Sequence, residues 1–569
     1  MRSLAASHPH ALPLSPQNPC NLNPFHDNAQ WNRLSSRTVL SNHPNTLTLL
    51  IIALYLAAAL AVGYFVRRHA NTSAKFLHAR GALPTAVSAL AFLAANCGAL
   101  EIVGIVATSA KYGALTLHFY WIGAIPAMVF LAFFMMPIYV RSGAMTVPDF
   151  IRLRYNPATH ILCALCLAIL MVLIAGISLF AISTILHTFF GWNFSLVAVV
   201  AASVVVCYAL TGGLRATIYN EILQLSLTVV GLLPLAVAVH RNFRRAGGVM
   251  RELPRAFTHI WTPLHFIHPA STMDVFGVVF GLGIILSFGY WCTDFIIIQR
   301  ALTARTMDGA IETPLVAAVF KLVFPWLVIF PGLAASLFLR NSPHPDFDQA
   351  LPLLIGRYYG PALIGLGISA ILASLMSGLA GNISAFSALW THDLYQTHLK
   401  PHLPDEHYLA VGRASTVVAA CLSVGTAYIV LLYNNLMDYL QFVFTLFNTP
   451  IFVVFMLGMF TVWATPTAAF WGLLCGVLAA GAHGAAIRCG LLVYGSPMLG
   501  DFYGAIYAGV VTFAVTAVAS RFTSPRSRES LRGITCFTQS EPRPPIPLTA
   551  WVLAVAVLTA CVALNCIYR

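Results

Sequence analysis

Two ionisable residues stand inside long apolar runs, where a charge is costly and therefore a first candidate for chemistry. Glu101 lies in AFLAANCGALEIVGIV and Lys321 lies in LVAAVFKLVFPWLVIF. A charged side chain at mid-depth in lipid costs at least ~2.5–3.5 kcal/mol, so both side chains are expected to face a cavity or the protein interior. The alternatives are an internal salt bridge or a head group that reaches the membrane surface.

Further ionisable residues lie in or beside apolar runs, among them Glu221 in YNEILQ. Those near the ends of runs are predicted to be helix termini in contact with water; they are Asp294, Glu312, Asp393 and Asp438. Asp294 closes the stretch FGYWCTD, in which Tyr290 and Trp291 follow a long apolar run. A polar and aromatic cluster at that place is unexpected for a helix buried in lipid, and the elements around it have to explain it.

One apolar segment carries a stripe of small residues at helical spacing. In ILASLMSGLAGNISAFSALW the stripe runs through Ser374, Ser377, Gly381, Ser384 and Ala388. Such a stripe is typical of close helix packing in membranes. A second interpretation is that hydroxyl and carbonyl oxygens on this face bind a cation. The pattern alone leaves both open.

The composition indicates a polytopic membrane protein. Of the 569 residues 59% are hydrophobic and only 9% are charged, with a mean hydropathy of +0.80. Soluble domains carry about a quarter charged residues, which excludes a string of soluble domains. The net charge of +13 lies in short loops, so it indicates topology rather than nucleic-acid binding. Metal-ligand spacings, nucleophile elbows and phosphate loops are absent from the sequence, which argues against a membrane enzyme.

About 14 segments are long and apolar enough to be transmembrane helices. Their approximate limits are 46–66, 83–110, 117–140, 159–190, 194–211, 217–239, 273–299, 309–338, 359–396, 409–433, 436–458, 466–488, 503–521 and 548–567. Residues 1–45 are polar, and we expect a disordered N-terminal tail there, followed by one transmembrane domain over 46–569. Lys and Arg concentrate in the odd-numbered loops, which predicts that both termini face outward. The arginine-rich loop 240–272 is the exception.

Two of these segments are interrupted by small or polar residues. The second contains Asn96, Gly98 and Glu101, and the seventh contains Ser287 and Gly289 at a comparable place. Paired broken helices in two halves of a chain are typical of transporters built from inverted repeats. Unwound backbone at that depth is tolerated only inside protein or along a cavity, and its free carbonyls suit hard cations such as sodium.

Several motifs together resemble the sodium/solute symporter family, in particular its sodium/glucose cotransporter branch. They are AANCGALEIVG, TVPDFIRLRYN, TGGLRATIYNEILQ, FGYWCTDFIIIQRALTAR, FKLVFPWLVIFPG, ILASLMSGLAGNISAFSALWTHDLY and DYLQFVFTLFNTPI, in the order of the family. The resemblance implies an all-α polytopic membrane protein of the leucine-transporter-type fold, with inverted five-helix repeats and about 14 transmembrane helices, in agreement with the segment count.

The resemblance also implies which residues bind the solute. Asn96, Lys321 and Gln441 match family positions that contact sugar hydroxyls, and Tyr290 with Trp291 matches the aromatic pair of the sugar cavity. Ser287 falls at a position that is polar in relatives and is expected to line the same cavity. Two positions depart from the pattern. Tyr120 stands where sugar-transporting relatives have a glutamate, and Glu101 stands where they have Gln or His. Both are still expected to line the cavity.

For sodium, the resemblance implies carbonyl ligands from Ala94, Cys97 and Ser374 and a hydroxyl ligand from Ser377. Gly378 replaces a second serine, so one hydroxyl is lost. Together these residues predict a cation-coupled symporter, with sodium as the coupling ion, that imports a small polar organic solute such as a sugar or polyol by alternating access.

Three alternatives stay open at this point: coupling to protons through Glu101 or Glu221, uncoupled transport, and a sensor that keeps the transporter fold. The expected partners are the solute and the lipid bilayer of the cell membrane, with no nucleic acid and no required protein partner.

Overall fold

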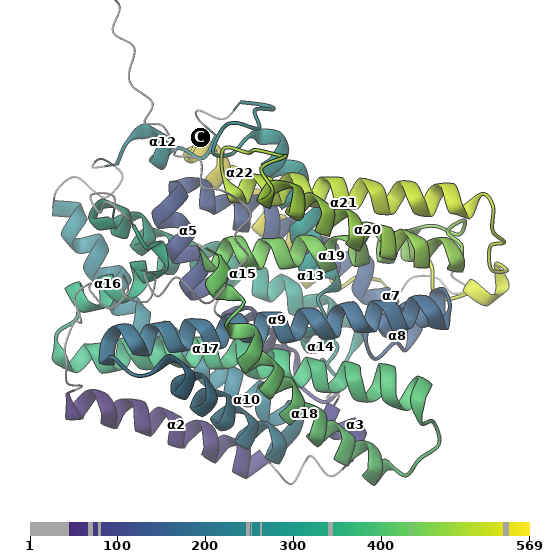
Figure 1. The fold of residues 1–569 in the computed structure, drawn as a ribbon, viewed down its shortest axis with the longest axis horizontal. Coiled ribbons are helices and arrows are strands. Elements are labelled where there is room, and N and C mark those ends of the chain that lie inside the picture. The colour runs from purple at the N-terminus through teal and green to yellow at the C-terminus, as the bar shows by residue number, and fades with distance from the viewer. Residues whose placement is uncertain are drawn as a thin grey trace, which may run out of the picture.

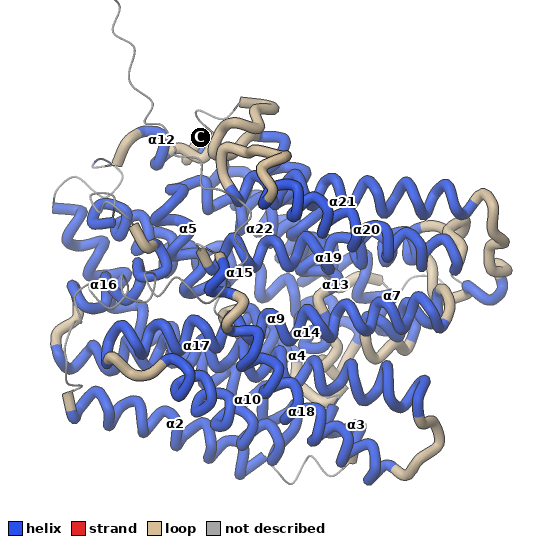
Figure 2. The backbone as a smooth tube through the Cα atoms, in the orientation of Figure 1, coloured by secondary structure: helices blue, strands red, loops and turns tan. Residues whose placement is uncertain are grey.

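The computed structural model describes residues 45–66, 72–77, 81–98, 100–245, 251, 253–261, 265–339, 345–433, 435–536, 538 and 545–569. Within these residues the chain is helical, and its one β feature is a bridge between Leu83 and Ala304 (Figure 2). Residues 1–44 of the expected tail lie outside the described part.

Most of the long helices could each cross a membrane. They are α2 (Thr46–Val66), α9 (Pro157–Phe190), α10 (Phe194–Arg245), α15 (Met307–Leu339), α17 (Pro361–Ala388), α18 (Asp405–Ala427), α19 (Leu436–Phe460), α20 (Pro466–Arg488), α21 (Pro497–Ser520) and α22 (Leu548–Ile567). A further span, Phe119–Ser142, is continuous through η4 (Phe119–Ala124), α6 (Ile125–Phe130), η5 (Leu131–Met135) and α7 (Met136–Ser142).

Short elements connect or extend these spans. They are α3 (Ser73–Leu77), η3 (Gly113–Leu117), α8 (Val147–Arg154), α12 (Arg255–Thr258), η7 (Phe347–Gln349), α16 (Ala350–Tyr358), η8 (Leu389–Leu399), η9 (Val430–Leu432) and η10 (Glu529–Leu531). Local signals set the ends of the spans. At the start of α9, Asn156 caps the helix by accepting a hydrogen bond from the Thr159 N–H. At its end Gly191 adopts φ 68°, a conformation that glycine reaches without strain.

Two further spans are broken. The first joins α4 (Thr85–Asn96) to η2 (Leu100–Gly104) and α5 (Ile105–Tyr112), with a bend of 60°. The second joins η6 (Gly277–Ser287) and α13 (Phe288–Thr293) to α14 (Phe295–Ala301), with a bend of 54°. Broken helices were expected in both places.

The position of the second break differs from the expectation. It lies at Asp294, and not at Ser287 and Gly289, which are helical. Asp294 has an extended backbone, and its side chain caps α14 by accepting from the Ile296 N–H at 3.0 Å. The residue that stops one half-helix therefore starts the next.

The structure contains 11 helices in its described part that are long and apolar enough to cross a membrane, or 13 if each bent pair is one span. This count takes α10 as a single span. The two segments expected at 194–211 and 217–239 are two helices that meet at a kink, where Gly213 adopts the non-helical angles φ 57° and ψ −153°; counted separately, they bring the 13 spans to the predicted 14.

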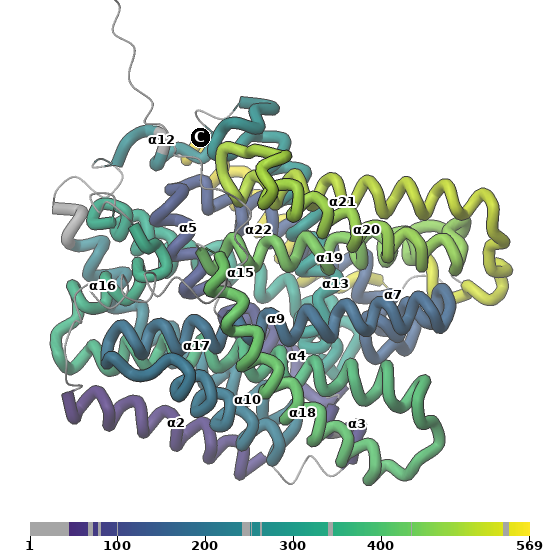
Figure 3. The backbone as a smooth tube through the Cα atoms, in the orientation of Figure 1, coloured from purple at the N-terminus to yellow at the C-terminus, as the bar shows by residue number. Residues whose placement is uncertain are grey.

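The broken helices lie inside the bundle. α17 packs against α2, α9 and α10, α15 packs against α4 and α5, and α19 packs against α13. In Figure 1 the long helices α2, α9, α17, α20 and α21 run roughly along the long axis of the view. Figure 3 shows α2 along the lower edge of the view and α21 at its upper right, with α13 and α14, which flank the second break, drawn between them.

Water contact was wrongly predicted for three acidic residues at helix ends. Asp294 and Asp393 are each 1% exposed and Asp438 is 7% exposed. Asp438 pairs with Lys111 at 3.0 Å, and Asp393 accepts from Thr146 at 2.7 Å. All three residues lie where their helices pack against other parts of the protein, so a position near the end of an apolar segment is not a position at the surface.

Candidate solute and sodium sites

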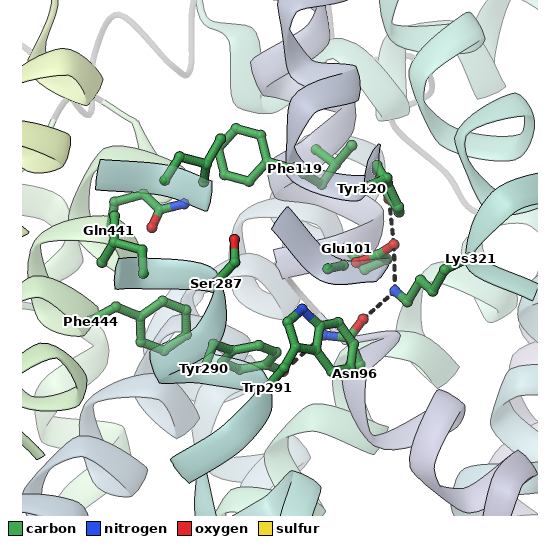
Figure 4. Close-up of a pocket in the computed structure, with 14 residues that line it drawn as sticks. Asn96, Glu101, Phe119, Tyr120, Ser287, Tyr290, Trp291, Lys321, Gln441 and Phe444 are labelled. Carbon is green, nitrogen blue, oxygen red and sulfur yellow. Dashed lines mark hydrogen bonds and ion pairs between the residues drawn. The ribbon is translucent and has the colours of Figure 1, made fainter. Parts of the chain in front are cut away.

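A cavity of about 50 Å³ lies between the two broken helices, with walls from η4, α15 and α19. All residues expected to contact the solute line it: Asn96, Glu101, Tyr120, Ser287, Tyr290, Trp291, Lys321 and Gln441. Figure 4 shows these side chains converging from separate helices. The sequence analysis missed other residues of the wall, including Phe119 and Phe444. Phe444 lies one helical turn after Gln441 on α19, so the spacing could have identified it.

One wall of the cavity holds a chain of paired polar groups. Lys321 Nζ lies 2.7 Å from Glu101 Oε1 and also donates to Asn96 Oδ1. The Tyr120 hydroxyl donates to Glu101, and Asn96 Nδ2 donates to the Tyr290 hydroxyl at 2.8 Å. Figure 4 shows the links among Tyr120, Glu101, Lys321 and Asn96 as a continuous line of contacts.

The charges on this wall cancel. The side chains of Lys321 and Glu101 are 1% and 6% exposed, so the pair is buried as an ion pair. Aromatic rings surround the ammonium, with Nζ 5.5 Å from the ring centroids of Tyr120 and Trp291. Tyr120 and Glu101, the two positions at which the sequence departs from the expected pattern, contact each other through their hydrogen bond. The cavity therefore contains one carboxylate, and it is paired.

The opposite wall carries polar groups that are free. Ser287 and Gln441 form no side-chain hydrogen bond with any described residue, and Figure 4 shows both beside the open centre of the cavity. Ser287 Oγ lies against Gly123, where a Cβ atom would collide with it, so the glycine makes room for the hydroxyl. Asn435 starts the helix that carries Gln441 by accepting from the Met437 N–H at 2.8 Å.

A second cavity of about 40 Å³ lies behind the first. Asn96, Tyr290 and Phe444 line both cavities and form the partition between them. The rings of Tyr290 and Phe444 lie 5.2 Å apart, and Asn96 donates its hydrogen bond to Tyr290 within this partition. Passage from one cavity to the other requires these three side chains to separate.

The four residues expected to bind sodium also lie together. Ser374 Oγ donates to the Cys97 carbonyl at 2.6 Å and to the Gly98 carbonyl at 3.3 Å, and Ser377 Oγ donates to the Ala94 carbonyl at 3.4 Å. The break after α4 thus presents its carbonyls to the hydroxyls of α17. If a sodium ion bound here, these hydrogen bonds would be lost, and the hydroxyls would turn their oxygens toward the ion while keeping their protons. The residues present fit a hard cation, whose preferred ligands are oxygens.

Glycines allow this close approach. A Cβ atom on Gly98 would lie 3.2 Å from Gly378 Cα, which is tighter than most real contacts of this kind. Gly378 therefore lies directly beside the break, and it also lines the second cavity.

Glu221, a candidate proton carrier, lies outside both cavities. It forms an ion pair with Arg300 at 2.5 Å, and both side chains are 0% exposed. The pair ties α10 to α14. Sequence reasoning missed it because the partners are 79 positions apart.

Comparisons with known proteins agree with this geometry. The model of the sodium:solute symporter family matches residues 76–476, more than half of the chain. A sodium/glucose cotransporter 1 from Ovis aries is 26% identical over 536 residues, covering 84% of this chain and 79% of the relative. A sodium/myo-inositol cotransporter 2 from Homo sapiens is 25% identical over 547 residues, covering 86% of this chain and 79% of the relative.

Among solved structures, a substrate-bound, outward-open sodium-coupled sialic acid symporter aligns with a TM-score of 0.74 and 17% identity, covering 85% of this chain and 99% of the other. This likeness shows the leucine-transporter-type fold that the motifs implied. The protein is therefore a multi-pass helical membrane transporter and not an enzyme, and its coupling ion is sodium. Because the family model matches most of its length, the chain belongs to the sodium:solute symporter family.

Proposed function

We propose that this symporter imports a small, uncharged, polyhydroxylated solute, such as a sugar or a cyclic polyol, together with sodium. The observation that carries the proposal is the pair of free polar groups, the Gln441 amide and the Ser287 hydroxyl, in a cavity whose charges cancel. Relatives named as sodium/glucose and sodium/myo-inositol cotransporters support the same class of solute.

The charge balance argues against an ionic solute. Lys321 is the cation that would bind a carboxylate, and Glu101 neutralises it at 2.7 Å. An anionic solute would have to displace Glu101 and leave that carboxylate buried without a partner, which is strongly unfavourable. A neutral solute can instead hydrogen-bond to the outer side of the pair and keep it intact.

The apolar part of the wall suits a ring with alternating hydroxyl and C–H groups. Tyr290, Trp291 and Phe444 offer aromatic faces, and a small number of placed polar groups then fixes orientation and specificity. An amide both donates and accepts hydrogen bonds, and so does a hydroxyl, which matches the two roles of a solute hydroxyl.

Sodium and solute act on one short stretch of chain. The proposed ligands Ala94 and Cys97 flank Asn96, which belongs to the solute cavity. A sodium ion that fixes the two carbonyls also fixes the Asn96 side chain between them. If sodium tightens solute binding in this way, the solute tightens sodium binding by the same factor.

Proton coupling has less support. Glu101 and Glu221 each have a cationic partner, Lys321 and Arg300, at 2.7 Å and 2.5 Å. A carboxylate held in a buried ion pair is a poor proton carrier, because its protonation leaves the partner cation buried and uncompensated.

Uptake into proteoliposomes tests the proposal. We expect D-glucose or myo-inositol to accumulate under an imposed sodium gradient and not under a proton gradient alone, and N-acetylneuraminic acid to be excluded. Gln441→Ala should abolish this uptake, whereas Gln396→Ala, the same change outside both cavities, should leave it unchanged. Accumulation of the anionic sugar without any neutral polyol would refute the proposed solute class.

A further inference from the structure

Asp294 is a buried carboxylate without a cationic partner among the described residues. It is 1% exposed, and its Oδ1 accepts a hydrogen bond from the Ile296 N–H at 3.0 Å. Its Oδ2 forms no hydrogen bond of ordinary geometry in the described structure, and the amide of Asn448 lies beside the carboxylate. A charge left in this state is costly, and an ionisable group at such depth is by default a candidate for function.

Asn382, which lines the same cavity as Asp294, carries a second oxygen without a partner in the described residues. Its Nδ2 donates to the Gly378 carbonyl at 2.7 Å, so the hydrogen bond itself fixes which end of the amide is the nitrogen. Its Oδ1 is therefore the end left over, and this atom has no partner in the described part of the chain. Asn382 is 3% exposed, so bulk water does not satisfy the oxygen.

Both residues line the second cavity, together with Gly98, Ser178 and Gly378. The volume of about 40 Å³ admits an ion with a few waters. Gly98 and Gly378 form its border with the proposed coupling site, because the Gly98 carbonyl accepts from Ser374. An ion that leaves the Cys97 and Gly98 carbonyls toward Gly378 would therefore enter the second cavity directly.

We propose that this second cavity is a separate sodium site, in which Asp294 Oδ2 and Asn382 Oδ1 bind an ion next to the coupling site. The proposal rests on sodium being the transported cation. Carboxylate and carbonyl oxygens select hard cations. A calcium ion takes six to eight oxygens and usually several carboxylates, whereas this cavity supplies one carboxylate.

The site also explains the partition. Tyr290 and Asn96 separate the second cavity from the solute, so an ion at Asp294 lies behind the solute and not beside it. The ion would neutralise the Asp294 carboxylate, which lies between the end of α13 and the start of α14. A change in the angle between these two half-helices would then release the ion.

Equilibrium binding of ²²Na⁺ to the purified protein in detergent, without solute, tests the proposal. We expect two ions per chain at saturation for the parent and one for Asp294→Asn. Asparagine keeps the size of the side chain and the oxygen that caps Ile296, so the fold should be preserved. Asp308→Asn, which removes an equal charge from an exposed helix start, should still bind two ions.

Two further variants separate this site from the coupling site. Ser377→Ala should also bind one ion, lost from the other site. If Ser377→Ala binds as the parent does while Asp294→Asn loses an ion, the coupling site is misassigned and the second cavity stands. If Asp294→Asn binds two ions, the proposal is overturned. Asp294 would then be stabilised by a bound water or by its own protonation, and not by sodium. Asn382→Asp should lower the sodium concentration that half-saturates the Asp294 site, and Asn382→Leu should raise it.

Discussion

The buried pair between Lys321 and Glu101 makes a prediction about stability that can be separated from transport. At 2.7 Å and a dielectric constant of about 20, the attraction within the pair is about 6 kcal/mol. Desolvation cancels much of this, and breaking such a pair by removing one partner typically costs about 3–5 kcal/mol. Glu101→Gln should destabilise the protein by this amount, because the ammonium stays buried with only neutral acceptors.

Replacing both partners should restore most of the loss. Replacing a buried ion pair by apolar or neutral groups of similar volume is often neutral or stabilising, so Glu101→Gln combined with Lys321→Met should approach the stability of the parent. Transport should not return, because Asn96 loses its ammonium donor and the cavity loses its carboxylate. The pair between Arg152 and Asp149 is the control: Arg152 is 42% exposed, and Arg152→Gln should cost at most about 1 kcal/mol.

Thermal unfolding in detergent, without solute, measures these differences. With an unfolding entropy of roughly 2.1 cal/mol/K per residue, a loss of 3–5 kcal/mol lowers the midpoint by about 3–4 °C. Single variants that unfold like the parent would refute the buried ion pair. A double variant as unstable as Glu101→Gln would show that packing, and not the unpaired charge, dominates the cost.

Three other predictions concern the solute cavity and the sodium site between α4 and α17. Asn96→Ala and Gln441→Ala should each abolish sodium-driven uptake while expression in the membrane stays near that of the parent, which radiolabelled uptake and immunoblots compare. Gly378→Ser restores a hydroxyl beside Ser377 and should lower the sodium concentration for half-maximal uptake. Sodium at 100 times its dissociation constant should stabilise the parent over choline by about 2.7 kcal/mol for each occupied site; a thermal-shift midpoint equal in both salts would contradict sodium binding.

The fold was predictable because each membrane span is a continuous run of about 20 apolar residues, which the local sequence alone identifies. Length and hydropathy located the spans, and the two segments predicted within α10 are two helices that meet at Gly213, whose φ is 57°. The residues of the solute cavity were predictable for a different reason. Their motifs resemble a known family, and the structure brings them together around one cavity.

The partners of buried charges were not predictable. Asp294 resembled a helix end in water, but its helix ends at a break inside the bundle. The sequence did contain a local signal, since an aspartate before the apolar run FIIIQ is typical of a helix start. The pairing of Glu221 with Arg300 has no local signal at all, because tertiary packing alone joins α10 and α14.

The position of Asn96 suggests how transport avoids a sodium leak. This residue lies between the proposed sodium ligands Ala94 and Cys97, accepts from Lys321 on the solute side, and donates to Tyr290 across the partition. Opening the partition requires the bond to Tyr290 to break, and an unpaired amide in this interior is costly. A solute hydroxyl can compensate by accepting from the same Nδ2 atom. The partition would then open at low cost only with solute bound, and sodium alone would stay behind it. Asn96→Ala removes that cost, so it should convert coupled transport into a sodium leak, which ²²Na⁺ flux into solute-free proteoliposomes would measure; flux no greater than in the parent would refute this role of Asn96.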